Sequence, residues 1–174
     1  MSSQLINYPV PLSTITPWSR ESLGACSSST APASGSYSSS NLGFFVPFYL
    51  YAQATAYGMK CVNGASVSGN IDMGIYSVDG RRLASKGSTA QSGTSAEQTL
   101  TFTTPLSMSP GFYFMAIACD NTTATFFRRN TSSVLLKALG MYQATSVFAL
   151  PATVTYATIT TSYVPAFGVY FLNV

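Results

Sequence analysis

One stretch, residues 69–119, constrains the fold of this chain more than any other. It begins with the alternating segment Asn-Ile-Asp-Met-Gly-Ile-Tyr-Ser, passes through Asp79-Gly80 and a Gly/Ser/Thr-rich loop, and ends in an apolar segment after Pro110-Gly111. Alternation with period two is typical of a strand with one buried face, and Asp-Gly is a strong signal for a β-hairpin. The stretch therefore predicts consecutive β-strands joined by tight turns.

The same kind of pattern continues along most of the chain. Apolar or alternating segments separated by turn residues predict strands at 44–52, 55–62, 70–78, 81–86, 98–102, 112–118, 124–128, 147–150, 154–160 and 166–172. Turns at this spacing are typical of sandwiches and jelly rolls. We therefore predict an all-β fold, an antiparallel β-sandwich that is jelly-roll-like, with one short helix at 132–139 ended by Gly140.

Four of these segments carry more detailed expectations. Pro47 suggests an edge strand or a bulge within 44–52. In 70–78, Ile71, Met73 and Ile75 are expected on the buried face and Asp72 on the polar face. Segment 124–128 is expected to pair back on 112–118. Segment 166–172 is apolar on both faces, which favours a central strand or one that a partner buries.

The first 43 residues differ from the rest. Pro9, Pro11 and Pro17 break any helix at the start of this segment, and a Ser-rich stretch of low complexity follows. We expect two parts: an extended N-terminal arm and Ser-rich loop at 1–43, and the sandwich domain at 44–174. The apolar residues of the arm are candidates for binding a partner, in particular Tyr8, Leu12, Ile15 and Trp18. The alternative is a partly disordered tail.

Composition limits the function classes. Only 7% of the 174 residues are charged, against roughly 25% in a typical soluble domain. A surface of uncharged polar residues suits an oligomer that buries much of its surface, or an extracellular or virion particle. The pairs Arg81-Arg82 and Arg128-Arg129 are too sparse for a nucleic-acid interface and are expected at solvated turns or strand ends. No signal peptide and no transmembrane helix are expected, so no membrane partner is predicted.

The sequence offers little catalytic chemistry. It contains no histidine, which removes the commonest general base and metal ligand. Of the five acids, only Asp72 is not expected in a turn or beside a polar loop, so a catalytic carboxylate pair has no support. We expect no catalytic residue, no metal, no cofactor and no enzymatic activity. The acids are Glu21, Asp72, Asp79, Glu97 and Asp120.

The three cysteines, Cys26, Cys61 and Cys119, match no metal or redox spacing. Cys61 and Cys119 lie in apolar strand contexts and are expected as buried small side chains, with a bridge between them as the alternative.

Tyrosines are the more promising surface residues. Tyrosines on strand faces can stack on sugars or fill subunit interfaces, and the alternative is that they are core and interface residues. Those in or near predicted strands are Tyr49, Tyr51, Tyr57, Tyr76, Tyr142, Tyr156, Tyr163 and Tyr170.

About a third of the chain resembles a β-sandwich module of tailed-bacteriophage virion proteins. The similarity lies in the run Gly-Ile-Tyr-Ser-Val-Asp-Gly at 74–80, with Leu83 and Gly87, followed by Gln-Thr-Leu-Thr-Phe-Thr-Thr-Pro-Leu at 98–106 and Pro-Gly-Phe-Tyr-Phe-Met-Ala-Ile-Ala at 110–118. Such modules occur in capsid cement (decoration) proteins and in tail-fibre or receptor-binding tips. In both, the turn residues hold the scaffold and specificity resides in the loops.

The resemblance implies a virion protein made in the host cytoplasm. A fibre protein normally carries a repetitive shaft or heptads, which this sequence lacks. The arm and compact sandwich therefore favour a cement protein on the capsid surface that binds the major capsid protein, as a homotrimer because such proteins commonly sit on three-fold axes. The alternative is a tail-fibre or receptor-binding tip that recognises a host glycan or receptor.

Overall fold

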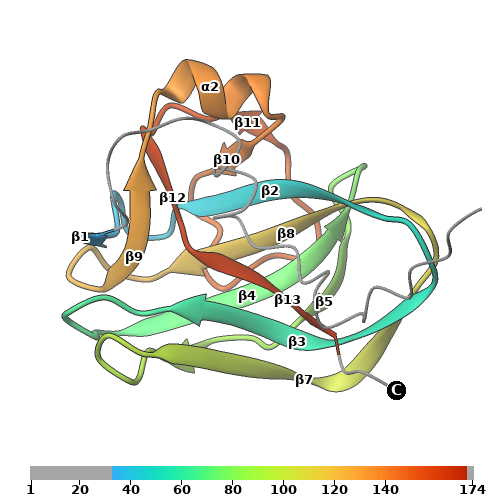
Figure 1. Ribbon diagram of the computed structural model, residues 1–174, viewed down its shortest axis with the longest axis horizontal. Coiled ribbons are helices and arrows are strands. Elements are labelled where there is room, and N and C mark those ends of the chain that lie inside the picture. Colours follow the sequence, from blue (N-terminus) through green and yellow to red (C-terminus); the bar gives the residue numbers. More distant parts are fainter. Residues whose placement is uncertain (1–32, 172–174) are drawn as a thin grey trace, which may run out of the picture.

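The computed structural model describes residues 33–171, and within them the chain forms an all-β sandwich of antiparallel sheets (Figure 1). The largest sheet has the order β11-β10-β2-β8-β4-β5, with β6 also paired to β4. Its strands are β2 (Gly43–Leu50), β4 (Asn70–Ser77), β5 (Arg82–Ser85), β6 (Thr89–Ala90), β8 (Gly111–Cys119), β10 (Tyr142–Ala144) and β11 (Ala157–Thr158). The predicted all-β antiparallel sandwich is confirmed.

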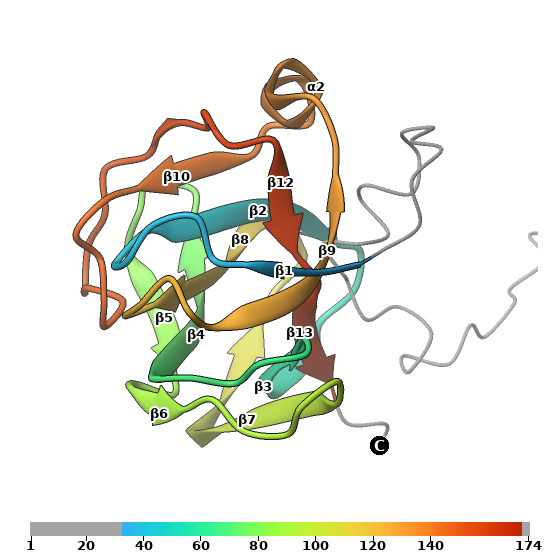
Figure 2. The same ribbon diagram turned by 90° about the vertical axis from the view of Figure 1, so that its left-hand side faces the viewer.

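Two smaller sheets cover one face of the large sheet. One has the order β1-β9-β12, from β1 (Ala33–Ser36), β9 (Thr125–Asn130) and β12 (Tyr163–Pro165), and the other has the order β13-β3-β7, from β13 (Phe167–Phe171), β3 (Ala54–Val62) and β7 (Glu97–Met108). The chain passes directly from β12 to β13, and Ala166 joins the two sheets: its N–H donates to the Phe127 carbonyl and its carbonyl accepts from the Val62 N–H (Figure 2).

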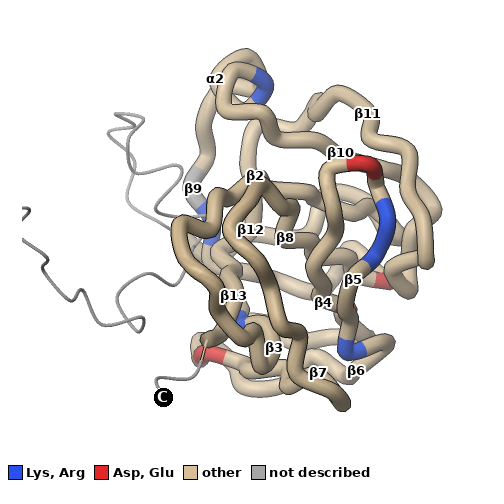
Figure 3. Tube along the Cα trace, turned by 90° about the vertical axis from the view of Figure 1, so that its right-hand side faces the viewer, with Lys and Arg blue, Asp and Glu red and all other residues tan. Residues whose placement is uncertain are grey.

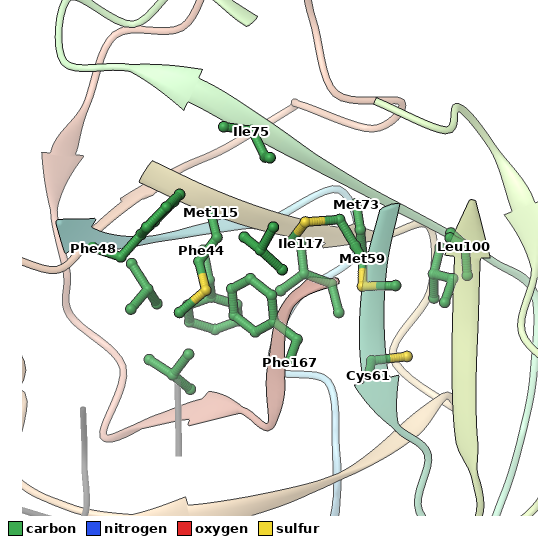
Figure 4. Packing of buried hydrophobic residues seen from close by; sticks show 14 of the residues in the cluster. Phe44, Phe48, Met59, Cys61, Met73, Ile75, Leu100, Met115, Ile117 and Phe167 are labelled. Atoms are coloured by element: carbon green, nitrogen blue, oxygen red, sulfur yellow. The ribbon is translucent and has the colours of Figure 1, made fainter. Parts of the chain in front are cut away.

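The main core fills the space between these layers. Alternating residues of β2, β4 and β8 point inward and meet side chains from β3, β7, β9, β12 and β13. Figure 4 shows Phe44, Met115, Ile117 and Phe167 packed together at its centre. This burial of apolar surface is what the period-two pattern encodes.

The Asp79-Gly80 hairpin forms as predicted and joins β4 to β5. Gly80 has a positive φ of 85°, and its N–H donates to the Ser77 carbonyl at 3.1 Å. Such a backbone conformation favours glycine, which explains the Asp-Gly pair. By contrast, Pro110-Gly111 joins two different sheets, since β7 pairs with β3 whereas β8 pairs with β2 and β4.

Several expectations for individual segments need correction. β9 does not pair back on β8; it pairs with β1 and β12. β13 pairs only with β3 among the described strands, so it lies at a sheet edge, although its Phe167 and Val169 are fully buried. The segment 147–150 is not a strand, and 154–160 contributes only the two-residue β11. These pairings are set by contacts between distant residues, which local patterns do not report.

The folded part of the chain begins earlier than residue 44. β1, within the expected Ser-rich loop, pairs with β9, and Tyr37 and Leu42 are buried in the main core. The helix α2 (Ser133–Ala138) was predicted correctly: the Ser132 hydroxyl accepts from the Val134 N–H at 3.2 Å as an N-cap. At Pro47, the pairing of β10 with β2 has already ended at Phe45, so the proline sits where β2 is open on that side.

Candidate functional site

The outer face of the large sheet, opposite the main core, carries the candidate binding surface. Residues 144–156, which we call the covering segment, fold back over β2, β4 and β8 and form a second apolar cluster on part of this face. Its members are Phe45, Tyr76, Phe114, Ala116, Ala118, Ala144, Val147 and Leu150, with Phe148, Val154 and Tyr156 packed against them. The expectation that Asp72 lies on a polar face of β4 is therefore wrong, because this segment buries that face too.

Tyrosine hydroxyls hold this covering segment in place. The Tyr76 hydroxyl donates to the Pro151 carbonyl at 2.6 Å, and the Tyr156 hydroxyl donates to the Ser77 carbonyl at 2.8 Å. Burial raises the pKa of both phenols above the ordinary value for tyrosine. Both hydroxyls therefore remain protonated donors at neutral pH.

Asp72 of β4 binds the covering segment through a hydrogen bond. Its carboxylate accepts from the Ser85 hydroxyl at 2.8 Å, from the Gly87 N–H at 2.9 Å and from the Leu150 N–H at 3.0 Å. The side chain is fully buried, and this burial raises the pKa of the carboxyl, although the hydrogen bonds and Arg82 oppose the shift. Asp72 therefore joins three separate segments of the chain and has a structural role.

Beyond the covering segment, the outer face ends in exposed aromatic rings. Tyr49 at the end of β2 is 41% exposed, Phe112 at the start of β8 is 64% exposed, and Tyr51 in the following bend is 81% exposed. The Tyr49 ring centroid lies 4.7 Å from that of Phe112 and 4.8 Å from that of Tyr51. We call Tyr49, Tyr51 and Phe112 the aromatic corner.

Further aromatic rings continue from the aromatic corner into the covering segment. Phe114, the next residue of β8 on this face, contacts Tyr142 and Tyr156 at ring-centroid distances of 5.7 and 4.7 Å. Tyr142 and Tyr156 stack on each other at 5.5 Å, and Tyr142 remains 36% exposed. The outer face is thus aromatic along β2, β8 and β10, and its open end is the aromatic corner.

The acids among the described residues serve local structure. Asp79 accepts from the Ser77 hydroxyl, which lowers the pKa of its carboxyl. Glu97 pairs with Lys60 at 2.8 Å on the surface. Asp120 accepts from the Asn70 N–H at 2.9 Å, and although burial opposes the shift, its hydrogen bonds lower the pKa of its carboxyl. Within residues 33–171, no three acidic, cysteine or histidine side chains come together as a metal-binding group.

The basic residues are scattered over separate elements (Figure 3). Besides Lys60, which pairs with Glu97, Arg82 and Arg128 have structural partners. The Arg128 guanidinium lies 3.6 Å from the centroid of the Tyr163 ring, and it donates to the Ser36 carbonyl at 2.8 Å. Arg82 donates to the Leu150 carbonyl and so also holds the covering segment. Arg82 is exposed at the start of β5, as expected for a solvated strand end, whereas Arg128 is half-buried within β9, so the expectation is wrong for Arg128.

Cys61 and Cys119 are buried free thiols, as the sequence predicted, and they form no bridge in this structure. Burial raises the pKa of Cys61 to about 12 and that of Cys119 to about 11. Such thiols are poor nucleophiles because almost none of the thiolate is present at neutral pH.

Of the predicted site residues, those of the arm lie outside the structure and the tyrosines lie within it. Tyr8, Leu12, Ile15 and Trp18 lie outside the described residues. Among the tyrosines, Tyr49, Tyr51 and Tyr142 are exposed, Tyr76 and Tyr163 are buried, and Tyr57, Tyr156 and Tyr170 are half-buried. Phe112 was missed because its segment looks uniformly apolar; its place directly after Pro110-Gly111, at a strand end, was the available signal.

Comparison of the chain with known protein families, with curated proteins and with solved structures found no match. Within residues 33–171, no helix is long and apolar enough to cross a membrane. The geometry of the sandwich and its surface therefore carries the functional argument.

Proposed function

We propose that this chain is a non-enzymatic structural protein of a bacteriophage virion, a cement protein that binds the major capsid protein and stabilises the head. The observation that carries the proposal is that the acidic side chains have structural partners, whereas several large aromatic side chains have no cover. The described acids hold turns, an ion pair and the covering segment, while large aromatic side chains point into solvent. A rigid sandwich with an uncharged, aromatic surface suits lasting contact with another protein.

The resemblance to phage virion modules supports the same proposal. Its most distinctive residues, Asp79-Gly80 and Pro110-Gly111, form a hairpin and a crossing between sheets in this fold. They are scaffold residues, as expected for a module whose specificity lies in its loops. A homotrimer on the capsid surface remains part of the proposal.

Heads that lack the protein are expected to lose genome at a lower temperature than complete heads, and added purified protein is expected to restore the difference. The measurement is DNA release against temperature for wild-type, deletion and reconstituted particles. Identical release curves for wild-type and deletion particles would contradict the cement function. A virion reconstruction that places the protein on the tail would contradict it independently.

Binding of the purified protein to deletion heads is expected to depend little on salt. Because only 7% of residues are charged, the contact is expected to be apolar and polar, and the affinity should stay within about a factor of two between about 0.1 and 1 M NaCl. A sedimentation assay across this range measures it. A steep fall in affinity would show that a few charges dominate the contact.

A second candidate function is a receptor-binding tip at the tail. The exposed aromatic corner favours it, because exposed tyrosine and phenylalanine rings are suited to stacking on sugars or receptor side chains. Purified protein would then bind host cells and block infection. Absence of both effects would exclude this candidate.

A further inference from the structure

The aromatic corner combines exposed rings with a backbone that is fixed by strand pairing. Tyr49 and Phe112 are directly opposite each other in the β2–β8 ladder, so the backbone holds both rings on a rigid sheet. The Tyr113 hydroxyl donates to the Ser109 carbonyl at 2.8 Å and fixes the turn that enters β8. The backbone under Tyr49 and Phe112 is thus held in place although their side chains are exposed, as expected for a preorganised contact surface.

The rings of the aromatic corner do not lie flat against each other. The planes of Tyr49 and Tyr51 are inclined at 74°, and those of Tyr49 and Phe112 at 62°. With neither neighbour parallel to Tyr49, the three rings form a ridged surface on which Tyr51 and Phe112 are the most exposed members. A flat apolar face of a ligand can stack on such a surface.

The aromatic corner is too small to form a complete protein interface by itself. Full coverage of three such side chains would bury about 300–400 Å², well below the roughly 800 Å² per partner of a stable protein interface. One or two sugar rings fit this area.

The charge around the aromatic corner indicates a neutral ligand. The segments that build it, residues 43–59 and 99–118, contain no Asp, Glu, Lys or Arg. By register the nearest charges lie in the β4–β5 hairpin, since Ser77 pairs with Tyr113. There Asp79 offsets Arg81, and Arg82 is bonded to the Leu150 carbonyl, so no unpaired positive charge is left for an anionic sugar. The tyrosine hydroxyls and the exposed Gln53, two residues from Tyr51, provide hydrogen-bonding groups for sugar hydroxyls.

From these observations we infer that the aromatic corner is a binding platform for a neutral carbohydrate, which stacks on Tyr51 and Phe112. This goes beyond stabilisation of the head and does not depend on where the protein sits on the particle. Glycan binding could hold a particle near a host surface whether the protein belongs to head or tail.

The test uses the purified full chain and a glycan array that carries neutral oligosaccharides of glucose, galactose, mannose and N-acetylglucosamine beside sialylated ones. Saturation-transfer NMR on the strongest hit gives an affinity. We expect binding to a neutral glycan, a fall in affinity of about tenfold in Tyr51→Ala, and no detectable binding in Tyr51→Ala/Phe112→Ala.

Val134→Ala is the matched control, because Val134 is a 71% exposed apolar residue on α2 and outside the aromatic corner. It should bind like the wild type, and circular dichroism should show all variants folded.

Three results would overturn the inference: no neutral glycan binds, only sialylated glycans bind, or binding survives both substitutions. A change from an oligomer to a monomer in the double variant, seen by light scattering, would assign the surface to a second copy instead. None of these outcomes bears on the particle-stability experiment, which tests the cement function separately.

Discussion

Tyr37→Ala is expected to lower the free energy of unfolding by about 3–5 kcal/mol, the range for deleting a large aromatic side chain from a core. The Tyr37 ring is 2% exposed and lies 5.5 Å from the rings of both Phe44 and Phe126. Its hydroxyl donates to the Leu42 and Ile117 carbonyls at 2.8 and 3.1 Å. The substitution would open a cavity where β1 and β9 meet the large sheet.

Urea denaturation of the purified protein measures this loss, and two variants serve as controls. Tyr37→Phe removes only the hydroxyl and should cost about 1–3 kcal/mol, because it leaves two buried carbonyls without this donor. Tyr51→Ala deletes an exposed tyrosine and should change stability by less than about 0.5 kcal/mol. If Tyr37→Ala were as stable as Tyr51→Ala, residues 33–43 would not belong to the core.

Tyr37 also shows where sequence patterns were insufficient. It lies among serines, and local composition there indicates a flexible loop. Its burial depends on β9, some ninety residues further along the chain, because β9 is the one strand of residues 33–171 with which β1 pairs. The alternating segments 70–78 and 112–118 could be predicted because strand periodicity and turn residues are local properties, whereas the partner of each strand is not.

The covering segment is the second feature that the sequence could not provide. Apolar residues at 147–150 and 154–160 resemble strands, but they form an irregular chain that packs on the outer face of β4 and β8. The hydrogen bond from the Leu150 N–H to Asp72 and an isolated β-bridge between Thr153 and Arg81 hold it there. Asp72 could be singled out as the acid without a turn role, but its burial could not be predicted because the segment that buries it is distant in sequence.

The candidate site was predicted in part. Tyrosines on strand faces include Tyr49 and Tyr51, but the sequence did not separate them from the buried Tyr76. Whether a tyrosine on this face is exposed or buried depends on which end of β2 the covering segment leaves uncovered. The same fact explains why Phe112 was missed, since it is exposed only because nothing within the described chain covers the start of β8.

Asp72→Ala is expected to destabilise the protein by about 3–5 kcal/mol. The substitution leaves the buried Leu150 N–H without its acceptor, which costs about 1–3 kcal/mol. It also removes the acceptor of the Ser85 hydroxyl, while the Gly87 N–H keeps its hydrogen bond to the Ser85 Oγ. It also removes the link between β4 and the covering segment. Urea denaturation at neutral pH measures the loss, and Asp79→Ala, which removes an exposed turn carboxylate, should cost much less.

The pH dependence of this difference tests the environment of Asp72. Burial raises the pKa of its carboxyl above the ordinary 3.8, so between these values the folded state holds a proton that the unfolded state has lost. The contribution of Asp72 to stability is therefore greatest below pH 3.8 and decreases as pH rises through the raised value. Wild type and Asp72→Ala share every other carboxyl, so the difference between their unfolding free energies isolates this group. That difference should shrink from acid to neutral pH, and a difference that grows instead would mean that the hydrogen bonds outweigh burial and hold the pKa low.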